Sequence, residues 1–421
     1  MQDIRSRERM LAAIRRQEVD HIPLYAWVFG FRPPAQLRWS EAGSPVEFWY
    51  TQRMEHLHTL PVAWDVTQDF KRVDAWLSLG IDDVLDVSVP WGQDERVTHR
   101  EWLLPPGAAL ETPNTPPVSG DVPLLVREYQ TPGGALYHAI RQTQEIQAPG
   151  WVVQPAHVEL FEDFNLPRAA RHLVTGPQDV PLMQWLYQRP GPAQERWLAE
   201  RMRQVAAFAR DRGVLVQAWS AYGVDAAIWM SGVENAVMLA MEHPDAFVEL
   251  LDIIHQADKG RTALALEQDV DMVVERGWYS SVDFWSPRLF IKYFKPRIAE
   301  LAAMAHARGK LFGYVMTTGV KLLGPELMDA GVDLLYFVDP IQDRLDLGWV
   351  RQAFAGRMAV AGGLSTSLTL TPADAAQIRV AVRSARDIFG TRGGFILSPV
   401  DALFPDTPWP AVQAMIDAWR G

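Results

Sequence analysis

Short apolar runs alternate along the chain with longer segments in which apolar residues recur at helical spacing. Short runs rich in β-branched and aromatic residues indicate buried strands, and the amphipathic segments between them indicate helices that cover a parallel sheet. The helical patterns at 287–308 and 372–389 each stop at a glycine, a common helix end. The predicted strands are 22–28, 83–87, 215–219, 272–275, 311–315, 334–338, 358–361 and 395–398. Eight strands with intervening helices predict an α/β fold, the (β/α)8 TIM barrel.

One connection is much longer than the others and has a strand pattern of its own. Residues 92–150, between the second and third predicted strands, contain many prolines and glycines, including Thr131-Pro132-Gly133-Gly134. Alternating patches at 124–129 and 135–141 flank this turn and predict a β-hairpin. Helical patterns at 177–187 and 191–212 lead back to the third strand. We expect a single barrel domain over residues 1–421, with a β-hairpin insertion at about 92–150 that covers the barrel mouth or forms a homodimer contact.

Composition narrows the classes of function. The 421 residues include 40 Lys and Arg and 51 Asp and Glu, and the net charge of −11 argues against nucleic acid or an anionic membrane as partner. There is no Cys, which excludes disulfides, thiolate-bound zinc, iron–sulfur clusters and cysteine nucleophiles. No apolar stretch has the length of a signal peptide core or a membrane helix, so we expect a cytoplasmic protein.

Barrel enzymes place their chemistry at the C-terminal ends of the strands, so the residues after each predicted strand form the candidate site. Aromatic side chains are frequent there, and the chain contains 17 Trp. This favours a pocket for a flat or apolar small molecule, with packing of the barrel's own interior as the alternative. The predicted substrate-binding residues are Trp27, Phe29, Trp219, Tyr222, Arg276, Trp278, Trp285 and Met316.

Acidic groups near the same strand ends are the candidate proton donors and acceptors, because aromatic surroundings raise a carboxyl pKa. The predicted catalytic residues are Tyr314, Asp339, Glu275, Asp283 and Asp401. Each has a structural alternative; Asp339, for example, precedes a proline and is equally suited to cap a turn. Arg276 is suited to hold a substrate carboxylate, but strand alternation turns only one of Glu275 and Arg276 inward.

Histidines and glycines give weaker signals. His56 and His58 stand two apart on a predicted helix and face different directions, so we predict no metal site there. His157 lies close in sequence to acidic residues, a grouping that is also common on surfaces. Residues 362–366 (Gly-Gly-Leu-Ser-Thr) follow the seventh strand, where many barrels bind phosphate, although tight chain reversal explains the glycines equally well.

Several motifs occur in a characteristic order along the chain. A helical segment at 7–13 leads to Val19-Asp20-His21-Ile22-Pro23, and 306–310, 329–333, Gly362-Gly363 and 405–409 follow towards the end. Their order and spacing resemble the uroporphyrinogen decarboxylase-like superfamily over nearly the whole chain. The resemblance implies a TIM barrel and one of two chemistries. One is decarboxylation of porphyrinogens; the other is transfer of a methyl group between a corrinoid protein and a thiol or another acceptor.

The sequence departs from the decarboxylase pattern. Where those enzymes have an Arg-rich loop after the first strand, residues 27–34 offer only Arg32, with Arg38 further on. Their late histidine corresponds to Asp401, and their pocket tyrosine falls near Ile228 or Trp229. A substrate with four acetate or propionate groups would be poorly bound.

The sequence also departs from the zinc methyltransferases. Their His-x-Cys motif after the fifth strand and their later Cys correspond to Tyr314-Val315-Met316 and to Ser398. The thiolate zinc site is therefore missing, and transfer to a thiol acceptor is disfavoured.

These departures leave three expectations. The first is a methyltransferase-like demethylase that moves a methyl group from a small, aromatic O- or N-methylated compound to a corrinoid protein. The alternative is a decarboxylase (carboxy-lyase) acting on a porphyrinogen or another carboxylate, which Arg276 or Arg32 would hold. The third is a barrel paralogue without catalytic activity.

Overall fold

The structure, a computed structural model, describes residues 4–41, 44–49, 54–55, 64–113, 115–143, 155–372 and 374–421. The chain forms two compact units. Unit 1 contains Met1–Val89, Trp197–Ser220 and Ala265–Gly421, and unit 2 contains Pro90–Arg196 and Ala221–Leu264.

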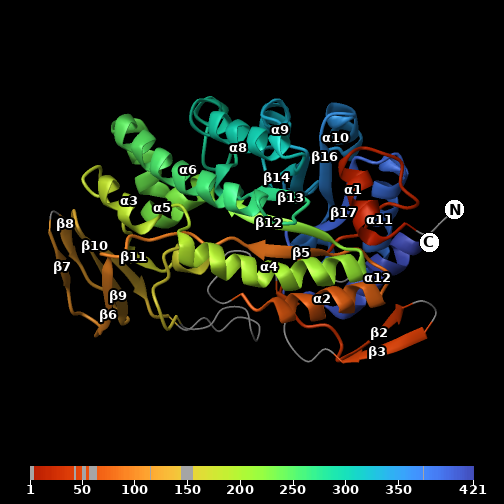
Figure 1. Cartoon of the computed structure of the whole chain (residues 1–421), viewed down its shortest axis with the longest axis horizontal. Helices are drawn as coiled ribbons and strands as arrows, with labels where there is room; N and C mark the ends of the chain where they lie inside the picture. Colours follow the sequence, from red (N-terminus) through yellow and green to blue (C-terminus); the bar gives the residue numbers. More distant parts are fainter. Residues whose placement is uncertain are drawn as a thin grey trace. The chain divides into compact units, whose positions relative to one another are not determined.

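A curled parallel sheet forms the centre of unit 1 (Figure 1). Its strands are β5 (Val84–Ser88), β12 (Leu215–Ala221), β13 (Met272–Glu275), β14 (Leu311–Val315), β15 (Leu334–Val338), β16 (Ala359–Ser365) and β17 (Phe395–Val400). They pair side by side in the order β17-β16-β15-β14-β13-β12-β5. The first predicted strand lies between the two edges of this sheet, because Leu24 bridges to Leu397 of β17 and Tyr25 bridges to Asp82, two residues before β5. The predicted (β/α)8 barrel is confirmed: seven of the predicted strands form the sheet, and the segment 22–28 joins it through isolated bridges.

Helices cover the outer face of this sheet. They are α1 (Ser6–Ile14), α2 (Val66–Ser78), most of α4 (Pro192–Arg212), α7 (Pro287–Leu289), α8 (Lys295–Ala307), α9 (Val320–Asp329), α10 (Leu347–Phe354), α11 (Ala375–Phe389) and α12 (Trp409–Arg420). The sequence accounts for their limits. In α11 the Asp374 side chain accepts hydrogen bonds from the backbone N–H of Ala376 and Gln377, and Gly390, at φ 60°, ends the helix. The buried stripe of this helix repeats at helical spacing.

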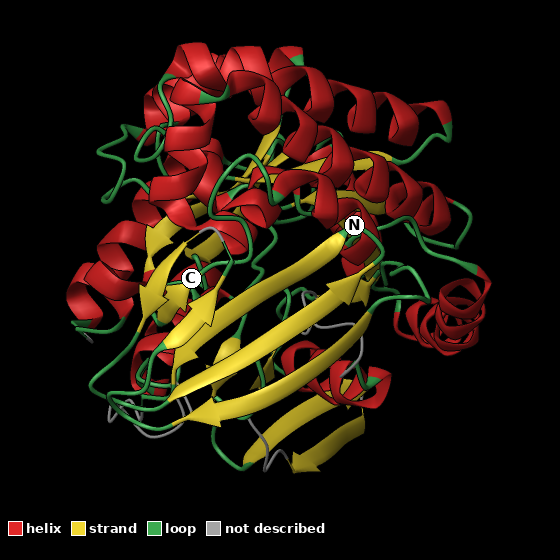
Figure 2. Ribbon diagram, turned by 90° about the vertical axis from the view of Figure 1, so that its left-hand side faces the viewer, coloured by secondary structure: helices red, strands yellow, loops and turns green. Residues whose placement is uncertain are grey.

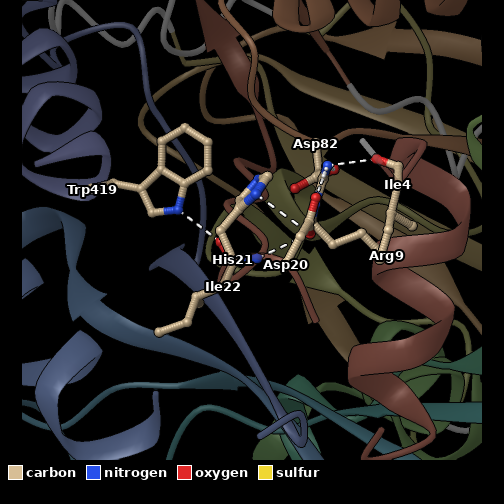
Figure 3. A network of polar contacts seen from close by, with 7 residues as sticks. All are labelled: Ile4, Arg9, Asp20, His21, Ile22, Asp82 and Trp419. Atoms are coloured by element: carbon tan, nitrogen blue, oxygen red, sulfur yellow. Dashed lines mark hydrogen bonds and ion pairs between the residues drawn. The ribbon is translucent and has the colours of Figure 1, made fainter. Parts of the chain in front are cut away.

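A buried arginine joins the first helix to the first two strands (Figure 3). Arg9 on α1 donates to Asp20 at 2.7 and 3.0 Å, to Asp82 at 2.7 Å and to the Ile4 carbonyl at 2.6 Å. Burial opposes ionisation of Asp20, but the hydrogen bonds and charge of Arg9 outweigh it and lower the pKa of Asp20 to about 2. Asp20 belongs to the Val19-Asp20-His21-Ile22-Pro23 motif, so this motif ties α1 to the N-terminal ends of the first two predicted strands.

Unit 2 contains the insertion and two long helices. Its sheet has the order β11-β10-β9-β6, and Figure 2 shows its long antiparallel strands side by side. These are β6 (Thr98–Leu104), β9 (Leu124–Thr131), β10 (Gly134–Arg141) and β11 (Ala169–Arg171). Strands β9 and β10 form the predicted hairpin, with Thr131 paired to Gly134 at the turn. The α-helices that lie wholly in unit 2 are α3 (Met183–Leu186), α5 (Gly223–Glu242) and α6 (Pro244–Leu266). The predicted helix at 177–187 is limited to α3 and a preceding 3₁₀ turn.

Three small two-stranded sheets complete the described chain. They pair β1 (Phe29–Phe31) with β4 (Met54–Glu55), β2 (Gln36–Glu41) with β3 (Ser44–Trp49), and β7 (Leu110–Thr112) with β8 (Thr115–Val118). In the described ranges, no helix combines the length and apolar character that a membrane crossing requires.

Candidate active site

Four aromatic side chains from four parts of the barrel meet at the C-terminal ends of its strands. We call Trp27, Trp219, Trp278 and Phe337 the aromatic layer. The Trp27 ring centre lies 6.5, 5.9 and 5.8 Å from those of Trp219, Trp278 and Phe337, and Trp219 stacks on Trp278 at 6.0 Å and 15°. Trp27, Trp219 and Phe337 are buried, whereas Trp278 is half-buried. The layer therefore closes the apolar barrel interior and leaves part of Trp278 accessible.

A chain of polar contacts lies against this layer inside the barrel. The Oδ1 atom of Asp86 accepts hydrogen bonds of 2.6 Å from Gln217 Nε2 and from Trp219 Nε1, and Tyr336 donates to Gln217 Oε1 at 2.6 Å. Burial, followed by the charge of Asp86, raises the pKa of Tyr336 and of Tyr25 well above the ordinary tyrosine value. Asp86 thus fixes the Trp219 ring, and Tyr336 holds Gln217, the other donor to Asp86. Asp86 was not among the predicted site residues, although a carboxylate within the apolar run 83–87 was an available signal.

Strand alternation shows which of Glu275 and Arg276 faces the barrel interior. Met272 and Val274 belong to the core cluster inside the barrel, so Arg276 is the next residue on that side of β13. Its guanidinium carbon lies 4.4 Å from the Trp278 ring centre, a cation–π contact. Glu275 is paired in register with Tyr314, whose hydroxyl donates to Ser280 Oγ at 2.8 Å. Arg276 thus adjoins the aromatic layer, and Tyr314 contacts the loop after β13.

The other predicted acids have different surroundings. Asp401 is half-buried, and its Oδ2 accepts a 3.1 Å hydrogen bond from Trp278 Nε1. Asp339 is buried, and its Oδ1 accepts from the backbone N–H of Ile341 and Gln342, so it caps the turn after β15. Asp283 is exposed and accepts from Ser281 and Thr318. Of these three, Asp401 is the one bonded to the aromatic layer.

Three predicted pocket residues of unit 1 remain. Phe29 is half-buried, with its ring 6.4 Å from that of Phe404. Met316 is buried, and its N–H donates to the Tyr336 carbonyl. The Trp285 indole donates to the Tyr279 carbonyl at 2.8 Å and lies 5.1 Å from Phe294, which places it in the packing of the 290–294 helical turn.

Tyr222 lies in a separate aromatic cluster within unit 2. Its ring is 5.1 Å from Phe161 and 5.3 Å from Trp229, and the Arg261 guanidinium lies 3.9 Å from its centre. The ring is fully buried. The Trp229 position, which the family pattern relates to the pocket tyrosine, bonds to Asp163 at 2.8 Å in the same cluster.

The glycine-rich end of β16 owes its composition to packing. A Cβ atom on Gly362 would lie 2.3 Å from the Val338 carbonyl oxygen, so the close approach of β15 requires glycine. This differs from both phosphate binding and tight chain reversal. Beyond it, the hydroxyls of Ser365 and Thr366 are buried without a hydrogen-bond partner among the described residues.

The remaining sequence signals contribute little to this site. His157 is exposed and contacts Glu101 at 2.9 Å. Arg32 is exposed, whereas His56, His58 and the Arg38 side chain lie outside the described residues. Over the described ranges, no three His, Cys, Asp or Glu side chains gather as metal ligands.

The fold is a TIM barrel, and its candidate site lies at the C-terminal ends of the strands. Residues 223–421, slightly less than half of the chain, match the family model described as uroporphyrinogen decarboxylase (URO-D). A methyltransferase from Methanosarcina mazei has the same fold at 16% identity, with a TM-score of 0.56 over 99% of each chain. The C-terminal part of the chain is therefore similar to the uroporphyrinogen decarboxylase family, and the whole chain shares its fold with the Methanosarcina methyltransferase.

Two other solved structures are similar to only part of the chain. A sugar phosphate isomerase/epimerase from Parabacteroides distasonis has 10% identity and a TM-score of 0.32, over 52% of this chain and 76% of that chain. A 3-keto-D-glucoside 4-epimerase from E. coli has 9% identity and a TM-score of 0.34, over 54% of this chain and 91% of that chain. No curated protein matches the sequence.

Proposed function

We propose that this protein is a methyltransferase-like demethylase that acts on a small methoxylated or N-methylated aromatic acid. The observation that carries the proposal is the aromatic layer with its half-buried Trp278, which touches both a cation, Arg276, and an acid, Asp401. A flat substrate ring would stack on Trp278. The superfamily and the Methanosarcina methyltransferase of the same fold are consistent with methyl transfer.

The arginines favour a substrate with one carboxylate. Arg276 is 3% exposed beside Trp278, whereas Arg32 is exposed to solvent. One guanidinium makes a bidentate pair with one carboxylate, and a porphyrinogen would require several such partners. This disfavours the decarboxylase alternative for porphyrinogens, although a smaller carboxylate substrate would satisfy the same arginine.

Three residues would have different roles in demethylation. Arg276 would hold the carboxylate, and Trp278 the ring. Asp401, half-buried and therefore reachable by water, would donate the proton to the oxygen or nitrogen as its bond to the methyl group breaks, giving a phenol or amine. A corrinoid on a partner protein would accept the methyl group. The chain has no Cys, so its own residues do not fit a thiolate zinc site.

Ligand-induced stabilisation tests this proposal. A ligand that binds only the folded protein raises its Tm. We expect a rise with methoxybenzoates and methylaminobenzoates, a smaller rise with methoxybenzene, and no rise with uroporphyrin. Arg276→Met should abolish the difference between methoxybenzoate and methoxybenzene. A response confined to porphyrin carboxylates would contradict the proposal and support the decarboxylase.

A further inference from the structure

We propose that unit 1 carries a second binding site, for a small organic anion, at the N-terminal end of the barrel strands. A cavity of about 270 Å³ opens beside Met358, just before β16, and beside Gly393 and Gly394, just before β17. The candidate active site lies at the opposite, C-terminal ends of the strands. The two sites are therefore separate, and this proposal does not depend on the demethylase assignment.

The charge of the cavity selects an anion. Arg16, Arg351 and Arg392 line it from three different segments, and its lining contains no Asp or Glu. On a chain of net charge −11, a cavity lined by three arginines and no acidic residue is unexpected. Guanidinium groups bind carboxylates and phosphates through paired N–H donors. The cavity therefore suits an oxyanion group.

The arginines keep donors for such a ligand. Arg16 donates one N–H to the Ile14 carbonyl at 3.2 Å, and Arg351 donates one to the Ile388 carbonyl. A guanidinium has five N–H donors, so these bonds orient the two groups without exhausting them. Arg392 is exposed at the rim.

The floor of the cavity is apolar, which selects an organic anion over an inorganic one. Val350, Phe354, Met358, Val360 and Phe389 line it, and each is at most 5% exposed. The volume is slightly below the usual range for drug-sized ligands, which begins at about 300 Å³. A carboxylate or phosphate attached to a single ring or a short alkyl group would match both floor and rim.

The backbone holds the rim in place. Arg16 has a φ of 60°, a left-handed conformation that non-glycine residues rarely adopt. Nearby, the Gly394 N–H donates to the Ala13 carbonyl at 2.7 Å, and a Cβ on Gly393 would lie 2.1 Å from the Gln17 carbonyl oxygen. The loop before β17 is thus pinned to the end of α1. This brings Arg16 and Arg392 to one opening before a ligand arrives.

Titration calorimetry of the full chain at low salt tests the site. The probes are phenyl phosphate and benzoate, with inorganic phosphate and benzylammonium for comparison. We expect saturable binding of at least one aromatic anion, weaker binding of inorganic phosphate and none of the cation. Arg392→Glu should weaken anion binding at least about tenfold, the loss of one charged hydrogen bond. Arg383→Glu, the same charge change at an exposed site on α11 outside the cavity lining, should not.

Three results would overturn the proposal. The first is no saturable binding of either aromatic anion up to about 10 mM, where a useful site would be largely filled. The second is equal affinity for inorganic phosphate and phenyl phosphate, which would remove the role of the apolar floor. The third is equal binding by the Arg392→Glu and Arg383→Glu variants, which would place the anion elsewhere. Circular dichroism of both variants confirms that they are folded.

Discussion

At the scale of single residues, Trp278 connects the parts of the candidate site. Its ring stacks on Trp219, its face meets the Arg276 guanidinium, and its N–H donates to Asp401. Strand-end reasoning from the sequence brought together all four of these residues. It gave no means of ranking Asp401 above Asp283 and Asp339, because that ranking depends on which side chain reaches the indole N–H.

Asp401 is the proton donor in the proposed reaction. Asp401→Asn keeps an oxygen that can accept from Trp278 but has no acidic proton. We expect the methyl-transfer rate to fall about 10²- to 10⁴-fold, the usual contribution of a general acid, with ligand-induced stabilisation unchanged. Asp406→Asn, at an exposed position in the same loop, is the control and should leave the rate within about twofold. Equal rates for the two variants would exclude Asp401 as the acid.

Arg9 is the residue on which the start of the barrel depends. Arg9→Met leaves the buried carboxylates of Asp20 and Asp82 without their guanidinium, and removal of one partner from a buried ion pair costs about 3–5 kcal/mol. Urea denaturation should show this loss at pH 7. Arg15→Met, exposed at the end of the same helix, should cost less than about 0.5 kcal/mol. A small effect of both variants would show that the Arg9 contacts do not anchor the barrel.

At the scale of elements, periodicity located the strands because a buried parallel strand is a short apolar run in any sequence. It could not give the side-chain directions where pairing is irregular. The register of β15 and β16 shifts between Tyr336 and Val338, and Tyr336 and Phe337 both belong to the core cluster. Simple alternation fails there, because it would not turn both Tyr336 and Phe337 towards the barrel interior.

The contact between β15 and β16 makes Gly362 sensitive to substitution. Gly362→Ala would place a Cβ 2.3 Å from the Val338 carbonyl at a φ of 149°, and we expect a loss of stability of more than about 2 kcal/mol. Gly390→Ala is the matched control, since Gly390 also has a positive φ but no atom within 4 Å of the added Cβ. Its cost should be about 1–3 kcal/mol, from backbone strain alone, and smaller than that of Gly362→Ala. Equal destabilisation in urea would mean that backbone conformation, and not packing, requires glycine at 362.

Strand β10 carries a histidine that should make the protein sensitive to acid. Burial, and then the charges of His172 and Arg127, lower the pKa of His138 to about 3. An unfolded histidine has a pKa of about 6.5, so between these values the unfolded chain binds a proton that the folded chain does not. Stability should therefore fall as the pH is lowered from 6.5 towards 3, by up to about 1.4 kcal/mol per pH unit from this group.

Comparison of variants isolates this contribution. His138→Phe should flatten the dependence of unfolding free energy on pH across that window, whereas His243→Gln, at an exposed histidine, should leave the slope unchanged. Denaturation curves at a series of pH values measure both slopes. An unaltered slope in His138→Phe would assign the acid sensitivity to other groups.

At the scale of the whole molecule, the sequence predicted the barrel and the position of the hairpin but not the division into two compact units. The barrel is predictable because each strand and helix has a local pattern. The two units depend on contacts between distant segments, such as 90–196 with 221–264, which no local pattern encodes. For the same reason, the cavity of Arg16, Arg351 and Arg392 was not anticipated, since its charges come together only in the fold.

The central claim is that the strand ends of this barrel support demethylation of an aromatic acid. The most direct measurement incubates the protein with a methoxybenzoate carrying a deuterated methyl group and with reduced cobalamin as acceptor, and follows the products by mass spectrometry. The account predicts one hydroxybenzoate and one deuteromethyl cobalamin for each substrate consumed, with no loss of carbon dioxide. Release of carbon dioxide with the methoxy group intact would contradict it and establish the decarboxylase.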